Sequence, residues 1–282
     1  MKVVKTIAAM KKARQSFLGK DTGTVGFVPT MGYLHEGHLE LVRHAKSENN
    51  RTVVSIFVNP AQFSPGEDLA SYPRDIPRDL EMLEKIGPDI VFIPSPQGMY
   101  PPRFSTWVNV EKVTERLEGA VRPGHFRGVA TVCAKLFNIV QPTIAYFGQK
   151  DAQQVVVIKK MVADLNLDIE IEVVPTVREP DGLAMSSRNI YLKPDERRAA
   201  IVIYRALKLC QKLWSQGEKD AHLVRRSMID LVEQEPLAEV IDYISIADAE
   251  TLEELHEIKP PALVSLAVKI GKPRLIDNIV LK

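Results

Sequence analysis

The stretch Val25-Gly-Phe-Val-Pro-Thr-Met-Gly-Tyr-Leu-His-Glu-Gly-His-Leu-Glu-Leu-Val42 decides the fold of this chain. It begins with an apolar run, Val25 to Val28, whose length and sharp boundaries are typical of a buried strand. We expect Pro29 to end this strand, because proline has no N–H to donate to a sheet ladder. A turn containing Gly32 follows, and the next apolar residues recur with helical spacing: Leu39, Leu41, Val42 and Ala45. The stretch therefore predicts a strand, a glycine-bearing turn and a helix.

Two histidines, His35 and His38, fall at the expected N-terminus of this helix. Free backbone N–H groups and the positive end of the helix dipole gather there, so the position favours phosphate groups. Two alternatives are an ordinary turn with surface histidines and a zinc site. Zinc is disfavoured, because no third His, Cys or carboxylate follows at ligand spacing nearby. We interpret the histidine pair as part of an anion-binding site.

Composition limits the classes of protein to which the chain can belong. Its 282 residues are 45% hydrophobic and 26% charged, which is ordinary for a soluble globular protein of two unequal domains. A net charge of +1 argues against a dedicated nucleic-acid binder, and no segment approaches the roughly 18 apolar residues of a membrane span. The N-terminus lacks the apolar region of a signal peptide, and only Cys133 and Cys210 are cysteines. We expect a cytoplasmic protein.

Strands alternate with helices over the first two thirds of the chain. Further strands are expected over residues 51–58, 89–94, 143–147 and 169–174, with an edge strand over 106–110. Helices are expected over residues 6–17, 78–86, 128–140 and 153–165. This alternation predicts an α/β fold with a Rossmann-like parallel sheet and helices on both faces.

The composition changes near Arg188. Two helices are expected over residues 197–214 and 221–232, and strands over 241–247, 262–268 and 275–280. We therefore predict a Rossmann-like domain over residues 1–185, which carries the anion-binding histidines, and a smaller C-terminal α+β domain over residues 186–282.

Polar clusters follow the predicted strands. They are Asn59 to Phe63, then Gly148 to Asp151 with Gln154, and then Thr176 to Arg178 with the loop 181–189. Ligands of open parallel sheets bind outside the carboxyl ends of the strands, so we expect these clusters on the same rim as His35 and His38.

The side chains of these clusters suggest their chemistry. Lys150 and Arg188 offer positive charge to phosphoryl oxygens, and Ser186 and Ser187 add hydroxyl donors. The amides of Gln62 and Gln154 suit the hydroxyl groups or carboxylate of a small substrate. The alternative interpretation is that the Ser-Ser-Arg segment is a polar connector and that the glutamines are solvated.

Other charged residues leave more than one interpretation open. Arg122 and His125 lie just before an apolar helix. They form either a second anion-binding site or an ordinary helix start. Glu67 and Asp68 could bind Mg²⁺ through water, but the simpler interpretation is that they are exposed carboxylates. Asp89 is the one candidate that we retain for Mg²⁺, bound through water, because it begins a strand beside the site.

Several stretches, in this order, resemble the pantoate–β-alanine ligase (pantothenate synthetase) family of the nucleotidyltransferase superfamily that carries a His-x-Gly-His signature. They are Pro29 to His38, Val53 to Phe63, Tyr72 to Arg74, Leu117 to Val129, Lys135 to Pro142, Phe147 to Gln154, Asp181 to Asn189 and Arg274 to Asn278. The resemblance covers nearly the whole chain.

The resemblance implies an ATP-dependent condensation of (R)-pantoate with β-alanine through pantoyl adenylate, with release of pyrophosphate and AMP. Catalytic roles then fall to His35, His38, Lys150, Ser186, Ser187 and Arg188, with His38 as the residue usually assigned as proton donor. The implied ATP-binding positions are these six residues with Met31, Gly32, Gly148, Gln149, Asp151, Val177 and Met185. Gln62 and Gln154 match the pantoate site, Gln62 also lies near β-alanine, and Asn59 and Arg122 are their neighbours. Magnesium with ATP, a homodimer formed through the N-terminal domain and a C-terminal lid are also implied.

Two positions depart from the family pattern: Gln149 stands where many members carry Glu, and Met185 where Leu is frequent. Two other functions remain as alternatives to the ligase. One is a nucleotidyltransferase that joins a nucleotide to a phosphate ester, and the other is a nucleotide sensor without turnover. The paired amides of Gln62 and Gln154 favour a small hydroxy acid over a phosphate ester.

Overall fold

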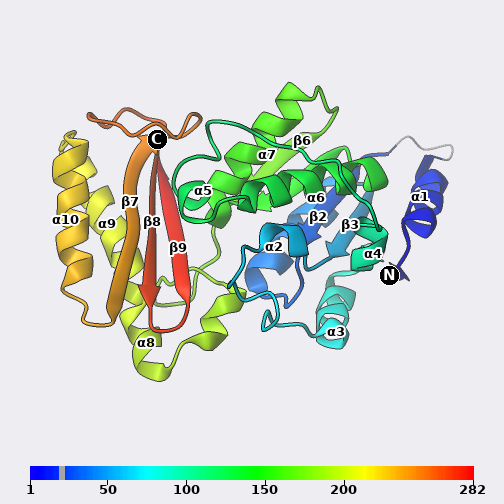
Figure 1. The fold of residues 1–282 in the computed structure, drawn as a ribbon, viewed down its shortest axis with the longest axis horizontal. Helices are drawn as coiled ribbons and strands as arrows, with labels where there is room; N and C mark the ends of the chain where they lie inside the picture. Colours follow the sequence, from blue (N-terminus) through cyan, green and yellow to red (C-terminus); the bar gives the residue numbers. More distant parts are fainter. Residues whose placement is uncertain (19–22) are drawn as a thin grey trace.

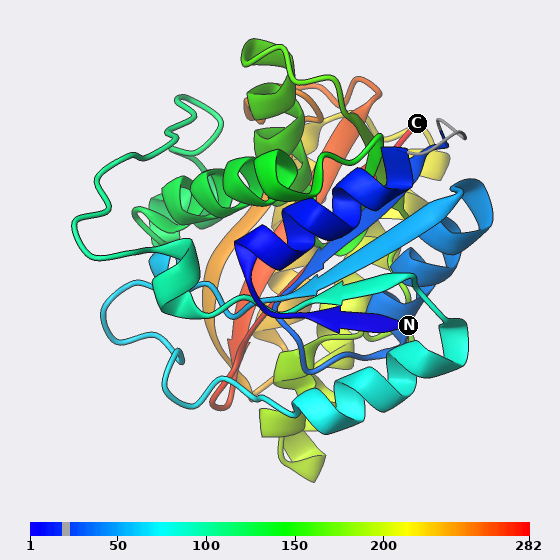
Figure 2. The same ribbon diagram turned by 90° about the vertical axis from the view of Figure 1, so that its right-hand side faces the viewer.

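A six-stranded parallel sheet forms the first part of the structure, a computed structural model that describes residues 1–18 and 23–282 (Figures 1 and 2). Its strands lie in the order β1-β4-β3-β2-β5-β6, and every neighbouring pair is parallel. Their bounds are β1 Lys2–Val4, β2 Val25–Thr30, β3 Arg51–Ile56, β4 Ile90–Phe92, β5 Ile144–Gly148 and β6 Glu170–Val174.

Helices cover both faces of this sheet, as the sequence predicts. They are α1 (Ile7–Gln15), α6 (His125–Val140) and α7 (Ala152–Asp164) on one face and α2 (Glu36–Glu48) and α3 (Ile76–Ile86) on the other. Successive strand side chains point to opposite faces, so Phe27 of β2 joins the first buried cluster and Val28 joins the second. The alternating apolar residues of the strands thus build two cores.

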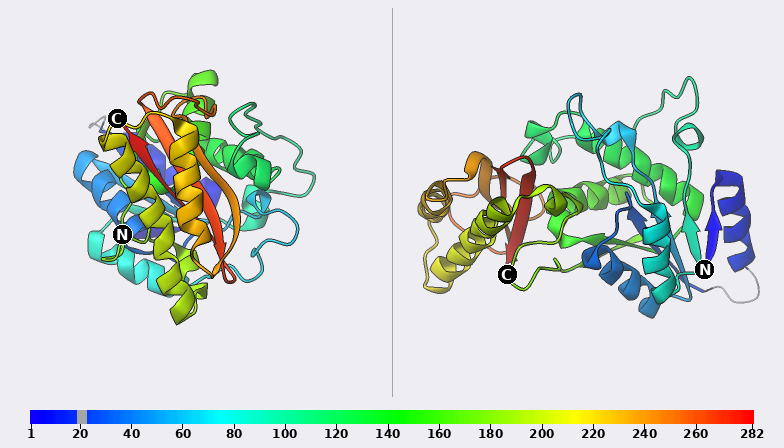
Figure 3. Two further views of the ribbon diagram at one scale, coloured as in Figure 1. Left: turned by 90° about the vertical axis from the view of Figure 1, so that its left-hand side faces the viewer. Right: turned by 90° about the horizontal axis from the view of Figure 1, so that it is seen from below.

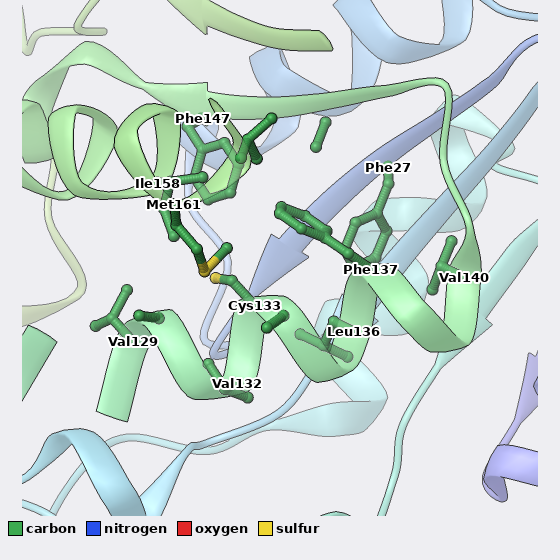
Figure 4. Close-up of a cluster of buried hydrophobic side chains, with 14 of the residues drawn as sticks. Phe27, Val129, Val132, Cys133, Leu136, Phe137, Val140, Phe147, Ile158 and Met161 are labelled. Carbon is green, nitrogen blue, oxygen red and sulfur yellow. The ribbon is translucent and has the colours of Figure 1, made fainter. Parts of the chain in front are cut away.

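Most residues of helix α6 are buried, and one side of this helix packs against the sheet (Figure 4). Its Phe137 ring meets the rings of Phe27 on β2 and Phe147 on β5 edge-on, at centroid distances of 6.4 and 6.5 Å. Cys133 lies one turn earlier on the same side of α6, facing Met161 of α7. This packing holds the beginning of α6 at the carboxyl edge of the sheet.

The strand order places a topological switch between β2 and β5. From β2 the chain moves outward through β3 to β4, and it then crosses to β5 and β6 on the other side. The connections after β2 and β5 therefore diverge and leave a crevice at the carboxyl ends of these strands, where ligands of such sheets bind.

The C-terminal part is a three-stranded antiparallel sheet, ordered β7-β8-β9, with helices on its outer face (Figures 1 and 3). Its elements are α8 Pro194–Ala199, α9 Ile201–Ser215, α10 Ala221–Glu233, β7 Ala238–Asp248, β8 Ala262–Ile270 and β9 Arg274–Leu281. Side chains of α9 and α10 share a buried cluster with this sheet, whereas Leu263 and Val280 pack against the core of the first part. The division at residues 185 and 186 stays a prediction.

The last strand, β9, also makes polar contacts with the first part of the chain. Arg274 donates from Nη1 to Glu118 at 2.8 Å, and its Nη2 lies 2.6 Å from the same carboxylate. Asp277 accepts from both terminal nitrogens of Arg178 at 2.5 and 3.0 Å. Glu118 and Asp277 are buried, so these ion pairs are shielded from solvent and fix the strand against the cavity described below.

Three predictions about the elements are wrong. Pro29 lies inside β2, opposite Ser55 of β3. The neighbour β5 pairs with β2 only at Gly26 and Phe27, and the proline nitrogen faces β5 beyond that pairing, so no ladder bond is lost.

Residues 106–110 form no strand, because Val108 donates to the side chain of Thr131 and the edge is instead taken by β1. The helix expected over 197–214 is divided at Ala200 into α8 and α9.

Within the residues that the structure describes, the connections contain six short helical segments. They are η1 Ser16–Leu18, η2 Pro60–Gln62, α4 Pro96–Met99, α5 Glu118–Val121, η3 Gln149–Asp151 and η4 Ser187–Tyr191. Among the described helices, none combines the length and the apolar character that a membrane span would need.

Candidate active site

A cavity of about 760 Å³ opens at the carboxyl edge of the parallel sheet and is closed on one side by β9. Most of the site residues predicted from the sequence line it: Met31, His35, His38, Asn59, Gln62, Arg122, Gly148, Lys150, Asp151, Gln154, Val177, Met185, Ser186, Ser187 and Arg188. They come from the segments that follow β2, β3, β5 and β6 and from the loop that leads into α6. The fold thus brings distant segments together at the edge where the parallel strands end, as the sequence predicts.

The two histidines are held by a strained turn after β2. Gly32 has φ +83° and Tyr33 has φ +49°, both in the left-handed region that glycine adopts most readily. Asp79 of α3, fully buried, accepts hydrogen bonds from the N–H groups of Tyr33 at 2.7 Å and Leu34 at 2.8 Å. Gly32 therefore serves the turn and is absent from the cavity lining, and Asp79 is a supporting residue that the sequence analysis did not find.

His35 is the N-cap of α2, and its N–H donates to Nδ1 of His38 at 3.3 Å. The two rings lie 4.0 Å apart between centroids. Because Nδ1 of His38 accepts this bond, the proton of the neutral ring resides on Nε2. Nδ1 of His35 is buried and has no hydrogen-bond partner within residues 1–18 and 23–282. An unpaired polar atom of this kind fits a site that awaits a ligand.

Burial keeps both rings uncharged. It lowers the pKa of His38 to about 4, with a further contribution from the positive charge of Lys150. It lowers the pKa of His35 to about 2, with contributions from His38 and Lys150. At neutral pH the pair therefore offers hydrogen bonds, and the positive charge of the site comes from lysine and arginine.

The side of the cavity that holds the histidines is completed by η4, which packs on the turn after β2. Ser187 donates from Oγ to the carbonyl of Tyr33 at 3.1 Å, and Ser186 accepts from the N–H of Arg188 at 3.2 Å. The Arg188 guanidinium is held by two hydrogen bonds to Asp68, of 3.0 and 2.9 Å. The predicted serines and arginine therefore lie on the same side of the cavity as the histidines.

Lys150 approaches the same region from η3, and Asn278 of β9 secures the backbone of this segment. The Asn278 amide donates to the carbonyls of Lys150 at 2.8 Å and Gln149 at 3.0 Å, and it accepts from the Gln149 side chain at 2.9 Å. Gln149 is absent from the cavity lining. Its amide thus supports β9 with a donor that a glutamate at this position would lack.

Another part of the cavity is organised around Gln62 of η2. Asn59, only 1% exposed, donates to Oε1 of Gln62 at 3.0 Å and to the carbonyl of Gly128 at 3.1 Å, and it accepts from Tyr100 at 2.8 Å. Gln62 donates to the sulfur of Met31 at 3.1 Å. These contacts fix the orientation of the Gln62 amide, so Asn59 acts on the cavity through Gln62.

Arg122 and His125 form a neighbouring node. His125 donates from Nδ1 to the carbonyl of Gln62 at 2.8 Å, and its Nε2 then accepts from Arg122 at 3.2 Å. Burial lowers the pKa of His125 to about 4, and the charge of Arg122 adds to this shift. Arg122 also bonds Glu67 at 2.8 and 2.7 Å. From the sequence alone, this stretch could be either an anion site or an ordinary helix start. In the structure, His125 bonds to the backbone of Gln62 and Arg122 bonds to His125, so the two residues support Gln62.

The structure contradicts the prediction for Asp89. This residue precedes β4 at the amino end of the sheet, opposite the cavity, because the first residue of a parallel strand lies away from the carboxyl edge. Its carboxylate is engaged by Arg51 at 3.0 Å and by the N–H of Thr52 at 2.9 Å. Over the described part of the chain, no group of three or more His, Cys, Asp or Glu side chains is arranged to hold a metal ion.

The buried histidines predict how stability depends on pH. In the unfolded chain each takes up a proton near the ordinary pKa of 6.5, whereas the folded values for His38 and His125 are about 4. Between these limits the unfolded state binds more protons, so the free energy of unfolding falls as the pH is lowered. We expect urea unfolding to show this loss from about pH 7 to pH 4 and a smaller loss in His125→Asn. Equal pH dependence in the two proteins would contradict the assignment to His125.

A doubly covered parallel sheet with a histidine pair, a lysine and a Ser-Ser-Arg segment at its switch point defines a nucleotide-using α/β enzyme. A sequence model of the family described as "Pantoate-beta-alanine ligase" matches residues 2–280. The chain belongs to this family of acid–amine ligases.

Individual relatives agree with this assignment. The chain is 56% identical to pantothenate synthetase of Roseiflexus sp. (strain RS-1) and 57% identical to that of Herpetosiphon aurantiacus, each over the full length of both proteins. The crystal structure of pantothenate synthetase from Thermus thermophilus superposes with a TM-score of 0.93 at 47% identity, covering 99% of each chain. A Francisella tularensis pantoate-beta-alanine ligase, complexed with beta-gamma ATP and beta-alanine, gives 0.81 at 34% identity, covering 99% of this chain and 97% of that one.

Proposed function

We propose that this cavity condenses (R)-pantoate with β-alanine at the expense of ATP, through a pantoyl-adenylate intermediate. The observation that carries the proposal is that positively charged and hydrogen-bonding side chains suited to phosphate line the same cavity as amides suited to a small acid. His38, Lys150 and Arg188 line it together with Gln62 and Gln154. Family membership over residues 2–280 supports the same reaction.

In the first step, a carboxylate oxygen of pantoate attacks the α-phosphorus of ATP, and the bond from that phosphorus to pyrophosphate breaks. Negative charge grows on the phosphoryl oxygens and on the leaving group. We assign its stabilisation to the Nε2–H of His38, the ammonium of Lys150, the hydroxyls of Ser186 and Ser187 and the guanidinium of Arg188. His35, whose Nδ1 is unpaired within the described residues, is assigned to the phosphates as well.

In the second step, the amine of β-alanine attacks the acyl carbon of pantoyl adenylate, the bond to AMP breaks and the amine loses a proton. The protein's contribution is to hold the reactants in line and to keep water away from the reactive mixed anhydride. Gln62, fixed by Asn59, and Gln154 are assigned to the acid substrate, and Arg122 lies beside them. Met31, Gly148, Asp151, Val177 and Met185 are assigned to the nucleotide.

Further parts of the proposal concern partners and assembly. Magnesium would accompany ATP, because phosphate oxygens are among the hard ligands that this ion prefers. Every step above is assigned to side chains of the chain. We also propose a homodimer through the N-terminal part, a lid role for the C-terminal part and a cytoplasmic location. The two buried cysteines, unpaired in the structure, suit a reducing compartment.

The direct test is to assay products with ATP, Mg²⁺, pantoate and β-alanine. The proposal expects AMP, pyrophosphate and pantothenate in equal amounts, and pantoate-dependent exchange of labelled pyrophosphate into ATP when β-alanine is left out. A stable nucleotide adduct as the final product would support a simple nucleotidyltransferase. ATP binding without turnover would support a sensor.

Replacing Gln154 with alanine tests the substrate assignment. We expect the KM for pantoate to rise about tenfold or more, while the KM for ATP changes little, because the lost amide hydrogen bonds serve the acid. Steady-state kinetics with each substrate varied in turn measures both constants. Gln216→Ala, an exposed position after α9, is the matched control. Equal losses for pantoate and ATP would show that Gln154 does not discriminate between them.

A further inference from the structure

Two adjacent carboxylates in the loop after η2 each form a salt bridge with one arginine of the cavity. Glu67 receives hydrogen bonds from Nε and Nη2 of Arg122 at 2.8 and 2.7 Å. Asp68 receives hydrogen bonds from Nε and Nη2 of Arg188 at 3.0 and 2.9 Å. Both pairs have the two-bond geometry that fixes the plane of a guanidinium as well as its position.

The two arginines come from different parts of the fold. Arg122 follows α5 and leads into α6, whereas Arg188 belongs to η4 beyond the parallel sheet. The loop that carries the carboxylates is itself tied to η4, because Tyr191 donates to the carbonyl of Ser71 at 2.9 Å. One short loop therefore sets the orientation of two cations of the cavity.

The pairs differ in what they leave for a ligand. Arg122 also uses Nη1, which donates to His125 at 3.2 Å, so each of its nitrogens has a protein partner. Nη1 of Arg188 makes no hydrogen bond to any residue that the structure describes. Asp68 thus occupies one edge of the Arg188 guanidinium and leaves the other edge available within the cavity.

Both carboxylates are ionised partners. Burial opposes ionisation of Asp68, but the hydrogen bonds and charge of Arg188 outweigh it and hold its pKa below the ordinary value. Glu67 follows the same pattern. Burial raises its pKa, but the hydrogen bonds and the charge of Arg122 outweigh burial and hold the pKa below the ordinary value. An ionised carboxylate aligns its arginine and also cancels part of the positive charge that a polyanion would meet.

We propose that Glu67 and Asp68 are positioning residues for the two sides of the reaction, Asp68 acting through Arg188 on the phosphates and Glu67 acting through Arg122 on the acid substrate. This inference rests on the proposed function. It assigns to the pair a role other than binding of Mg²⁺ or simple exposure to solvent.

Asp68→Asn separates orientation from charge. The amide keeps the size of the side chain, but it provides one acceptor and carries no charge. The site gains one unit of positive charge, so we expect the dissociation constant for ATP, measured by equilibrium binding, to stay unchanged or to fall. The maximal rate of pantoate-dependent ATP–pyrophosphate exchange should fall about tenfold or more, because the guanidinium loses its fixed plane. Asp68→Glu restores the charge and should recover part of this rate.

Glu67→Gln provides the mirror experiment on the neighbouring residue. We expect its KM for pantoate to rise several-fold while ATP binding stays at the wild-type value, since Arg122 lies on the substrate side. Asp195→Asn, an exposed residue of α8, controls for loss of a surface carboxylate.

A double-mutant cycle shows whether Asp68 works through Arg188. In an Arg188→Ala background, Asp68→Asn should cause no further loss of exchange rate. The inference is overturned if Asp68→Asn leaves the exchange rate unchanged, or if it lowers the rate equally with and without Arg188. It is also overturned if weaker ATP binding and a lower thermal midpoint accompany the loss, as a purely structural loop defect would produce. Absence of exchange in the wild-type protein would instead refute the proposed function.

Discussion

Replacing His38 with alanine is expected to lower turnover about a hundredfold, the usual loss when one positioned hydrogen-bond donor is removed from a transition state that gains charge. His38 is half-buried, its pKa is lowered to about 4 by loss of solvation, and its Nδ1 accepts the N–H of His35. Nε2–H is therefore a neutral donor held in one orientation before any substrate binds. The loss should appear in kcat of the complete reaction and in the rate of ATP–pyrophosphate exchange.

The matched control for this variant is His44→Ala, on the half-exposed face of the same helix. That change removes an imidazole from α2 without touching the cavity, so its turnover should equal that of the wild type. Circular dichroism and thermal unfolding of both variants separate loss of chemistry from loss of fold. Wild-type turnover in His38→Ala would refute the donor role.

Replacing Gly128 with alanine should damage both the fold and the substrate side. A Cβ at this position would lie 2.2 Å from the carbonyl oxygen of Ala61 and 2.6 Å from the nitrogen of Gln62. Both are backbone atoms, so the collision is relieved only if η2 and α6 move apart. We expect a loss of about 1–3 kcal/mol in the free energy of unfolding, the usual cost of overpacking.

The same displacement should reach the substrate, because the carbonyl of Gly128 accepts the Asn59 amide that holds Gln62. We expect the KM for pantoate to rise about tenfold or more, as for other small displacements of positioning groups. Gly98→Ala is the control, since a Cβ there would meet only the Ser95 hydroxyl, at 3.2 Å. An unchanged thermal midpoint together with an unchanged KM for pantoate would show that the close approach of η2 and α6 is unimportant.

The sequence predicted the parallel sheet and the rim on which the site lies because both follow from local patterns. Apolar runs such as Val25 to Val28 identify buried strands, and the carboxyl ends of parallel strands meet at one edge. The prediction failed where a residue's environment is set by segments distant in sequence. Pro29 continues its strand only because β5 stops pairing at Phe27.

Charged residues illustrate the same limit within the site. Asp89 was expected beside the site because it adjoins a strand. A residue lies at one edge of the sheet if it precedes the strand and at the other if it follows the strand, and Asp89 precedes β4. Asp68 and Asp79 gave no signal of their supporting contacts, since an aspartate in a loop or a helix is ordinary until its partner is known. Their partners, Arg188 and the backbone of Tyr33, lie 120 and 46 residues away along the chain.

The anchoring of β9 has a consequence for variation in residues 274–278. Within five positions, Arg274, Asp277 and Asn278 tie the last strand to Glu118, Arg178 and the main chain of Lys150. A premature stop codon or a proteolytic clip just before Arg274 would spare every side chain assigned to the nucleotide, yet it would release the wall that they face. Substitutions at Arg274, Asp277 or Asn278 are thus expected to disturb the cavity even though these residues are assigned no contact with the reactants.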